Sequence, residues 1–128
     1  WGDVEFKSLK QTFKYCSFLG NPDGSSITPG LPLTATDTPT FASDFVSDGL
    51  YEWAAYTSLT AIPNLSNWQI PDTLTSLERC FYQMGNFDSS VSNWDVSNVG
   101  NFKSMFYFCR DWKNGGDNLS SWKQVKTM

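Results

Sequence analysis

The sequence contains no histidine, no Cys-x-x-Cys pair, no Gly-x-Ser-x-Gly motif and no glycine-rich phosphate-binding loop. Zinc sites and most nucleophilic or acid–base active sites depend on one of these features. Catalysis would therefore have to rest on carboxylates alone. We expect a protein that is not an enzyme and that uses no metal and no cofactor.

Charged residues are also sparse. The 128 residues include 9 basic and 13 acidic ones, for a net charge of −4, and no short window holds more than two Lys or Arg. Without a basic field, a nucleic acid is not an expected partner. No apolar run approaches the roughly 18 residues of a membrane-spanning helix, so we expect no membrane insertion. No signal peptide is visible, and the chain opens and stops inside a repeat, so we expect a fragment or mature piece of a longer protein.

Cysteine is limited to Cys16, Cys80 and Cys109. An odd number argues against a disulfide framework, and a zinc site is not expected without histidine. Each cysteine falls at an apolar position of a repeating pattern, and Cys16 and Cys109 share one position of the repeat. We therefore predict that all three are small buried residues of the core.

Two apolar patterns follow each other along the chain and recur about 26 residues later. The first, over 65–70 and again over 91–96, has the alternation of a short strand with one buried face. The second, over 75–85 and again over 100–110, spaces apolar residues at i, i+3, i+4 and i+7, which predicts a short helix. This second pattern is carried by Leu77, Cys80, Phe81 and Met84, and then by Phe102, Met105, Phe106 and Cys109.

A period of this length predicts a repeat protein, because one unit cannot bury its apolar face without a neighbour. Trp68 and Trp94 hold the same position of the pattern, so we expect them to stack in successive repeats. The expected fold class is α/β, a leucine-rich-repeat-like solenoid of short parallel strands each followed by a helix. The whole chain forms one domain in this interpretation. Its expected repeats lie near 1–19, 41–60, 61–88 and 89–112, with a partial repeat at 119–128 and an insertion loop at 20–40.

Three short motifs carry a resemblance to a known family. LSNW, VSNWDVSNV and LSSW, beside helix-like apolar patterns, resemble the repeat of about 26 residues in BspA-like bacterial surface proteins, a divergent leucine-rich-repeat family. IPDTLTSLERCF is similar to the shorter BspA-type repeat. The resemblance covers 61–128 and, less closely, 1–19, whereas 20–60 departs from the family pattern. It implies cell-surface attachment or protein recognition rather than catalysis.

Acidic residues recur at Asp44, Asp48 and Glu52, a spacing that would place them on one face of a helix. Such a cluster could bind a cation or supply the acid and base of a glycosidase. The alternative is a solvated acidic face near a helix start. Gly49 interrupts the helix and the Asp-x-Asp-x-Asp-Gly pattern of a calcium loop is missing, so we expect the solvated face.

Two surfaces remain for a partner. The predicted strands place polar residues between buried ones, which would form a polar row on the sheet, although simple solvation explains such a row equally well. The predicted helices carry a tyrosine after the core position in successive repeats, with Trp53 expected to face outward one turn earlier. Such rings suit protein contacts or sugar stacking, but they can also cover gaps between helices. The predicted partner-binding residues are Tyr56, Tyr82, Tyr107, Trp53, Asn67, Asn93 and Asp95.

We expect a non-enzymatic recognition or adhesion module, extracellular or on the cell surface, that binds a protein. One alternative is a structural subunit of an extracellular assembly (a filament, virion or surface layer), with copies of itself as the partner. Another is a carbohydrate-binding domain with a glycan as ligand. Asn64 and Asn118 both match the glycosylation sequon, but their shared repeat register explains the match without attached sugar.

Overall fold

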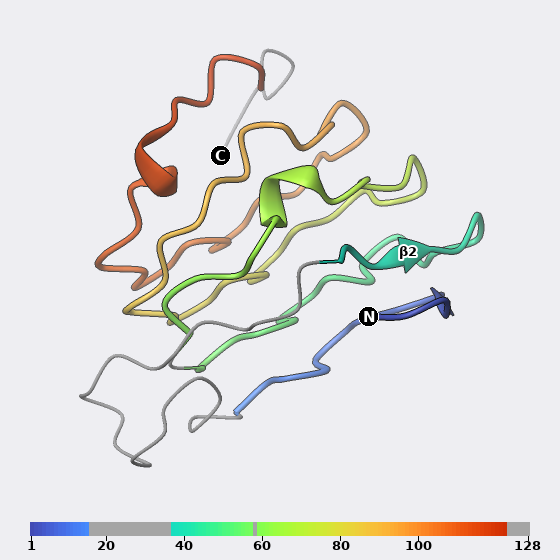
Figure 1. Cartoon of the computed structure of the whole chain (residues 1–128), viewed down its shortest axis with the longest axis horizontal. Helices are drawn as coiled ribbons and strands as arrows, with labels where there is room; N and C mark the ends of the chain where they lie inside the picture. The colour runs from blue at the N-terminus through green and yellow to red at the C-terminus, as the bar shows by residue number, and fades with distance from the viewer. Residues whose placement is uncertain (16–36, 58, 123–128) are drawn as a thin grey trace.

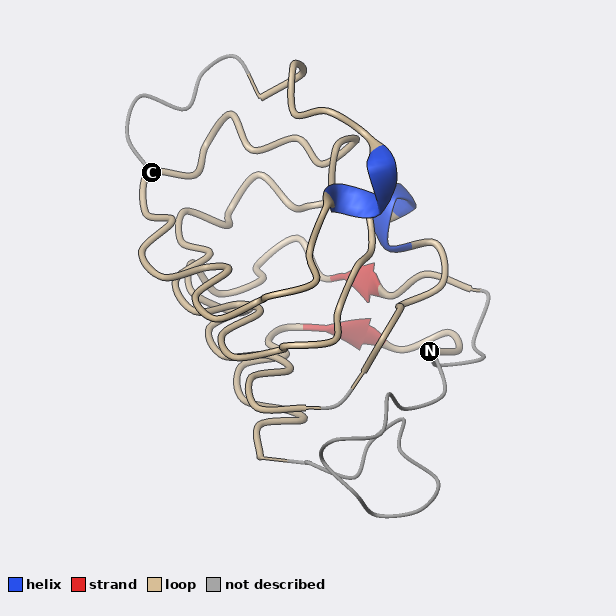
Figure 2. Cartoon of the chain, turned by 90° about the vertical axis from the view of Figure 1, so that its left-hand side faces the viewer, coloured by secondary structure: helices blue, strands red, loops and turns tan. Residues whose placement is uncertain are grey.

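The fold contains very little regular secondary structure. A computed structural model describes residues 1–15, 37–57 and 59–122. Within these residues two short strands pair in parallel, Glu5 with Thr40, and two 3-10 helices of one turn follow. Figure 2 shows the paired strands surrounded by turns and loops. The elements are β1 (Glu5–Phe6), β2 (Thr40–Phe41), η1 (Leu65–Asn67) and η2 (Asn114–Gly116).

Consecutive tight turns replace the predicted helices. Cys80 donates its backbone N–H to the oxygen of Leu77 at 3.2 Å, and Met84 does the same to Phe81 at 3.3 Å. The third residue of the first turn, Arg79, has a φ of 53°. A positive φ at this position is the requirement of a type II turn. Apolar residues three and four apart therefore share one face, as they would in a helix, but the backbone is not helical.

The hydrogen bonds between segments explain why no helix forms. Leu77 donates its N–H to Asn101 at 2.8 Å, and Phe81 donates to Met105 at 3.0 Å. An α-helix needs these N–H groups for carbonyls four residues earlier in its own segment. Because N–H groups of 75–85 are engaged with carbonyl groups of 100–110, both ranges form stacked coils of turns. We use the word coil for one such segment with its connections.

The predicted fold class is therefore wrong. The structure does not form an α/β, leucine-rich-repeat-like solenoid in which each strand is followed by a helix, and no α-helix occurs in the described residues. The predicted strands at 65–70 and 91–96 are also missing. Trp68 and Trp94 instead close turns, by donating their N–H groups to residues three positions earlier, each at 3.1 Å.

Successive coils run side by side (Figure 1). Their large apolar residues meet in one core. Trp53 and Trp68 pack edge to face with ring centroids 5.1 Å apart. Trp68 and Trp94 stack at 6.3 Å, and Phe81 stacks on Phe106 at 5.5 Å. The apolar period predicted the stacking of Trp68 on Trp94 in neighbouring repeats, although it assigned the wrong backbone to them. The contact of Trp53 with Trp68 was not predicted.

The cysteine prediction has a mixed outcome. Cys80 is buried and unpaired, and Cys109 is a half-buried free thiol that donates to the oxygen of Phe81 at 2.8 Å. Burial raises the pKa of Cys109 to about 11. Cys80 therefore lies in the core as predicted, and Cys109 lies at its edge. Cys16 is outside the described residues.

Several of the predicted segments are only partly covered by the residues that the structure describes. The predicted insertion loop at 20–40 is described only from residue 37 onward, where β2 begins at Thr40. The predicted partial repeat at 119–128 is described as far as Trp122. Trp122 is buried and packs against Phe102 at 5.7 Å, so this part of the chain contributes to the same core.

Candidate partner-binding surface

A continuous row of tyrosine rings crosses the stacked coils. We call Tyr15, Tyr56, Tyr82 and Tyr107 the tyrosine ladder. Tyr15 and Tyr56 are stacked with ring centroids 4.5 Å apart, and Tyr82 and Tyr107 are stacked at 5.0 Å. Tyr56 and Tyr82 meet at 5.5 Å with 65° between their planes. Four coils thus contribute one ring each to a single surface feature.

The backbone conformation explains the one tilted contact. Tyr15 and Tyr56 have positive φ values of 62° and 63° and lie at the same left-handed position of their coils. In the next coil this position is held by Gln83, with a φ of 55°, so Tyr82 lies one residue earlier. The ladder therefore changes register by one residue between Tyr56 and Tyr82, and the two rings meet at an angle.

The ends of the ladder are its most exposed parts. Tyr15 is 64% exposed and Tyr107 is 48% exposed, whereas Tyr56 and Tyr82 are half-buried. Phe108, which is 60% exposed, packs against Tyr107 with ring centroids 4.7 Å apart. Its φ of 57° is that of the left-handed position which Tyr15, Tyr56 and Gln83 hold in their own coils. The tyrosine ladder and Phe108 together form an exposed aromatic strip, and such a strip is a candidate for a binding surface.

A buried carboxylate lies beneath the ladder. Glu52 is only 1% exposed. It forms ion pairs with Lys14 and, at 3.1 Å, with Arg79, and it accepts a 3.4 Å hydrogen bond from Gln11. These contacts join three successive coils, because Lys14, Glu52 and Arg79 each come from a different one. We call this group the Glu52 cluster.

The Glu52 cluster also contacts the ladder directly. The Nζ of Lys14 lies 5.1 Å from the ring centroid of Tyr15, and the guanidinium of Arg79 lies 4.8 Å from that of Tyr82. Cations at these distances are attracted to an aromatic ring. The cluster therefore stabilises both the stacking of the coils and the positions of two ladder rings.

The electrostatics of Glu52 follow from this environment. Burial raises the pKa of the carboxyl group, but hydrogen bonds from Lys14, Arg79, Tyr51 and Gln11 outweigh that effect. The pKa of Glu52 is lowered to about 2. The group is therefore a fixed anion at neutral pH rather than a proton donor.

The expectation of a solvated acidic face is wrong for Glu52. Asp44 and Asp48 do lie toward solvent, where Lys7 contacts Asp44 at 3.2 Å and Lys10 contacts Asp48 at 2.7 Å. The three carboxylates bind different basic side chains instead of converging on one site, and Glu52 alone pairs with two of them. No group of three or more metal-ligating side chains of the His, Cys, Asp or Glu type occurs in the described residues.

The prediction that Trp53 faces a partner is also wrong, because its side chain is fully buried. Trp53 follows the left-handed residue Glu52, as Cys80 follows Arg79. It therefore occupies the core position of its coil, where it contacts Trp68 and, at 6.4 Å, Phe81. The alignment of the repeats within the sequence placed Trp53 one position away from this core position.

The predicted polar row lies at the surface but does not form a connected site. Asn67, Asn93 and Asp95 are all exposed. Asp95 accepts a 3.1 Å hydrogen bond from the backbone of Ser97. Within the described part of the chain, no hydrogen bond joins the three side chains to one another. Because 65–70 and 91–96 are not strands, the flat sheet face expected for this row is missing.

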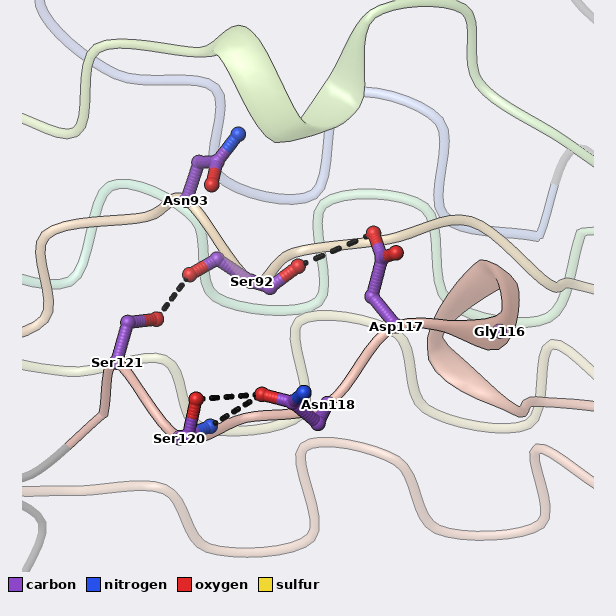
Figure 3. Close-up of a pocket in the computed structure, with 7 residues that line it drawn as sticks. All are labelled: Ser92, Asn93, Gly116, Asp117, Asn118, Ser120 and Ser121. Atoms are coloured by element: carbon purple, nitrogen blue, oxygen red, sulfur yellow. Dashed lines mark hydrogen bonds between the residues drawn. The ribbon is translucent and has the colours of Figure 1, made fainter.

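Asn93 does border a shallow polar hollow of about 610 Å³ (Figure 3). Ser92 donates to Asp117 at 3.2 Å, and Ser121 donates to the backbone oxygen of Ser92. These groups satisfy one another and include a single carboxylate, which does not amount to an acid–base pair. The lining residues are Ser92, Asn93, Gly116, Asp117, Asn118, Ser120 and Ser121.

Sequence reasoning missed two residues of the aromatic strip, Tyr15 and Phe108. Each directly precedes a cysteine, in Tyr15-Cys16 and Phe108-Cys109. The repeat alignment already paired the two cysteines, so it contained the signal that their preceding aromatic residues share a position. The three predicted tyrosines do form one row, but whether that row binds a partner stays a prediction.

Comparison with known proteins identifies the family. Residues 50–128, more than half of the chain, match the family described as "Mycoplasma protein of unknown function, DUF285". The chain therefore belongs to the DUF285 family. Comparison with curated proteins gave no match, and comparison with solved structures gave none either. In the described ranges, no helix has both the length and the apolar character needed to cross a membrane.

Proposed function

We propose that this chain is a non-enzymatic recognition module that binds a protein partner through the tyrosine ladder and Phe108. The proposal rests on one observation, the exposed and continuous aromatic strip that crosses four coils. Aromatic residues with few rotatable bonds are the usual anchors of protein interfaces. The resemblance of the sequence motifs to BspA-like surface proteins supports a location outside the cell or on its surface.

The arrangement of the rings favours a protein over a carbohydrate. Sugar rings bind aromatic side chains by lying on a free face of the ring. The planes of Tyr82 and Tyr107 are only 13° apart, so each ring covers a face of the other. The inner part of the ladder therefore presents ring edges and hydroxyl groups, which suit the mixed polar and apolar contacts of a protein surface.

Self-assembly is the second candidate function. The strongly exposed aromatic residues lie at opposite ends of the ladder, Tyr15 in the first described coil and Tyr107 with Phe108 in a late one. Contacts between unlike ends of identical molecules generate open filaments when the rotation does not close. A sedimentation series over increasing concentration separates the two candidates, because only self-assembly produces particles that grow with concentration.

A binding experiment tests the main proposal. The wild-type chain is screened against an array of purified extracellular proteins and glycans, and every hit is measured again with two variants. We expect the Tyr107→Ala/Phe108→Ala double variant to weaken binding at least about tenfold, as for the loss of interface anchors. Asp95→Lys, on the polar row, is the control and should leave the affinity within about twofold.

The opposite pattern would overturn the assignment of the surface. If Asp95→Lys abolishes binding while the double aromatic variant binds normally, the partner contacts the polar row. Far-ultraviolet circular dichroism of both variants excludes unfolding as the cause. Binding to glycans alone would show that the ligand is a carbohydrate and not a protein.

A further inference from the structure

The tyrosine ladder also has a chemical property that does not depend on partner binding. The four rings form two stacked pairs, Tyr15 with Tyr56 and Tyr82 with Tyr107, separated by one tilted contact. In each pair one ring is exposed and the other is half-buried. Each pair joins neighbouring coils whose residues are far apart in sequence.

We propose that the ladder is a site of oxidative cross-linking, at which a haem peroxidase with hydrogen peroxide joins Tyr15 to Tyr56 and Tyr82 to Tyr107 as dityrosines. The backbone holds each pair in place. Tyr15 donates its N–H to Ala55 at 3.1 Å, and Gln83, next to Tyr82, donates its N–H to Tyr107 at 2.7 Å. Phenol rings held in contact in this way couple faster than rings that must first meet by diffusion.

The reaction balances with one peroxide per bond. The oxidant removes one electron and one proton from each of two phenol groups, which leaves two phenoxyl radicals. The radicals form one carbon–carbon bond between the ring positions next to the hydroxyl-bearing carbons. The hydrogen atoms at those two positions then move to the oxygens and restore both phenols. Each pair loses two hydrogen atoms, and hydrogen peroxide accepts them and becomes two molecules of water.

Exposure determines how the second ring of each pair is oxidised. A peroxidase reaches Tyr15 and Tyr107, which are the exposed members. The two rings of each pair are in contact, with centroids 4.5 Å and 5.0 Å apart. The half-buried tyrosine therefore gives an electron and its phenolic proton to the exposed phenoxyl radical, which moves the radical to the half-buried ring. The exposed ring is then oxidised a second time, and the two radicals couple where they are generated.

The fifth tyrosine of the chain supplies an internal comparison. Tyr51 has no aromatic ring contact with another tyrosine in the described residues, and its ring lies 5.4 Å from the Nζ of Lys10. It is half-buried, like Tyr56 and Tyr82. Because Tyr51 lacks a stacked tyrosine partner, it should not couple in the folded protein.

Mass spectrometry of the full chain, treated with peroxidase and peroxide at high dilution, tests the proposal. We expect the monomer to lose two hydrogen atoms per bond, up to two bonds. Cleavage after Lys, Arg and Glu puts Tyr56, Tyr82 and Tyr107 on separate peptides, while Tyr15 and Tyr51 share the peptide 15–52. Fragment spectra and the Tyr51→Phe variant distinguish those two. The expected products join peptide 15–52 to the Tyr56 peptide, and the Tyr82 peptide to the Tyr107 peptide.

Matched variants test each dityrosine bond separately. Tyr56→Phe keeps the ring stack and should abolish only the first bond, and Tyr107→Phe should abolish only the second. Tyr51→Phe should change neither. Each bond closes a long loop in the unfolded chain, so the cross-linked protein should also unfold at a higher urea concentration than the untreated protein.

Three results would overturn the proposal. The first is coupling in the urea-unfolded chain but none in the folded chain. The second is a folded-state product dominated by Tyr51 or by the tilted Tyr56–Tyr82 pair. The third is cross-linking mainly between separate molecules at high dilution. Each would show that the stacked contacts do not direct the reaction.

Discussion

The indole Nε1 of Trp94 donates a 2.7 Å hydrogen bond to the backbone oxygen of Leu65, one coil earlier in the stack. Trp122 repeats this contact with Val91 at 3.2 Å. The same tryptophan position therefore both fills the core and ties each coil to the one before it. Trp68 occupies this position in its own coil, but its buried Nε1 has no hydrogen-bond partner among the described residues.

This difference predicts unequal effects of two identical substitutions. Trp94→Phe and Trp68→Phe remove the same atoms from buried sites, but only the first breaks a hydrogen bond. We expect Trp94→Phe to lower the free energy of unfolding by about 1–2 kcal/mol more than Trp68→Phe does. Urea unfolding followed by circular dichroism measures the difference. Equal losses would mean that the indole hydrogen bond contributes nothing to stability.

Replacement of the buried anion should weaken the stack of coils. Glu52→Gln keeps the shape of the side chain but leaves Lys14 and Arg79 without their counter-charge. We expect the free energy of unfolding to fall by roughly 3 kcal/mol at neutral pH, the value that corresponds to the lowered pKa of Glu52. The control is Asp48→Asn, which breaks the exposed pair with Lys10 and should cost no more than about 0.5 kcal/mol. A similar cost for the two variants would show that burial adds nothing to the Glu52 cluster.

The pH dependence of the free energy of unfolding should also reveal the contribution of Glu52. The pKa of Glu52 is about 2 in the folded protein, against an ordinary value of 4.5. A lowered folded-state pKa contributes stability above the unfolded-state value, and that stability is lost as the pH falls toward the folded-state value. Urea unfolding between neutral pH and about pH 2.5 should therefore show the gap between wild type and Glu52→Gln closing below about pH 4.5. A gap of constant size would assign the effect to packing instead of charge.

Neighbouring aromatic residues of one coil should differ in their contribution to stability. Phe106 is stacked between Phe81 at 5.5 Å and Trp112 at 3.8 Å, whereas the adjacent Tyr107 lies on the exposed ladder. We expect Phe106→Ala to cost about 3 kcal/mol. Tyr107→Ala should cost about 1 kcal/mol or less, mainly through the lost contact with Tyr82. Denaturant midpoints of the two variants measure the two losses of stability. A larger loss for Tyr107→Ala than for Phe106→Ala would contradict the side-chain directions in this coil.

The sequence by itself determined the repeat period and most of the core. Leu77, Cys80, Phe81 and Met84 were predicted to share one buried face, and all four are buried. The period also predicted the stacking of Trp68 on Trp94. These predictions depend only on which residues avoid water and on how far apart they lie, and both are properties of the sequence.

Only the tertiary structure decided the backbone between these residues. A helix and a series of type II turns both place residues i, i+3 and i+4 on one face, so the apolar pattern fits either. The choice depends on where the N–H groups find acceptors, and Leu77 and Phe81 find theirs in the next coil. The left-handed conformation of Glu52 then turns Trp53 into the core. Hydrogen bonds between distant segments depend on how the segments are placed in space, so the apolar pattern of one segment does not reveal them.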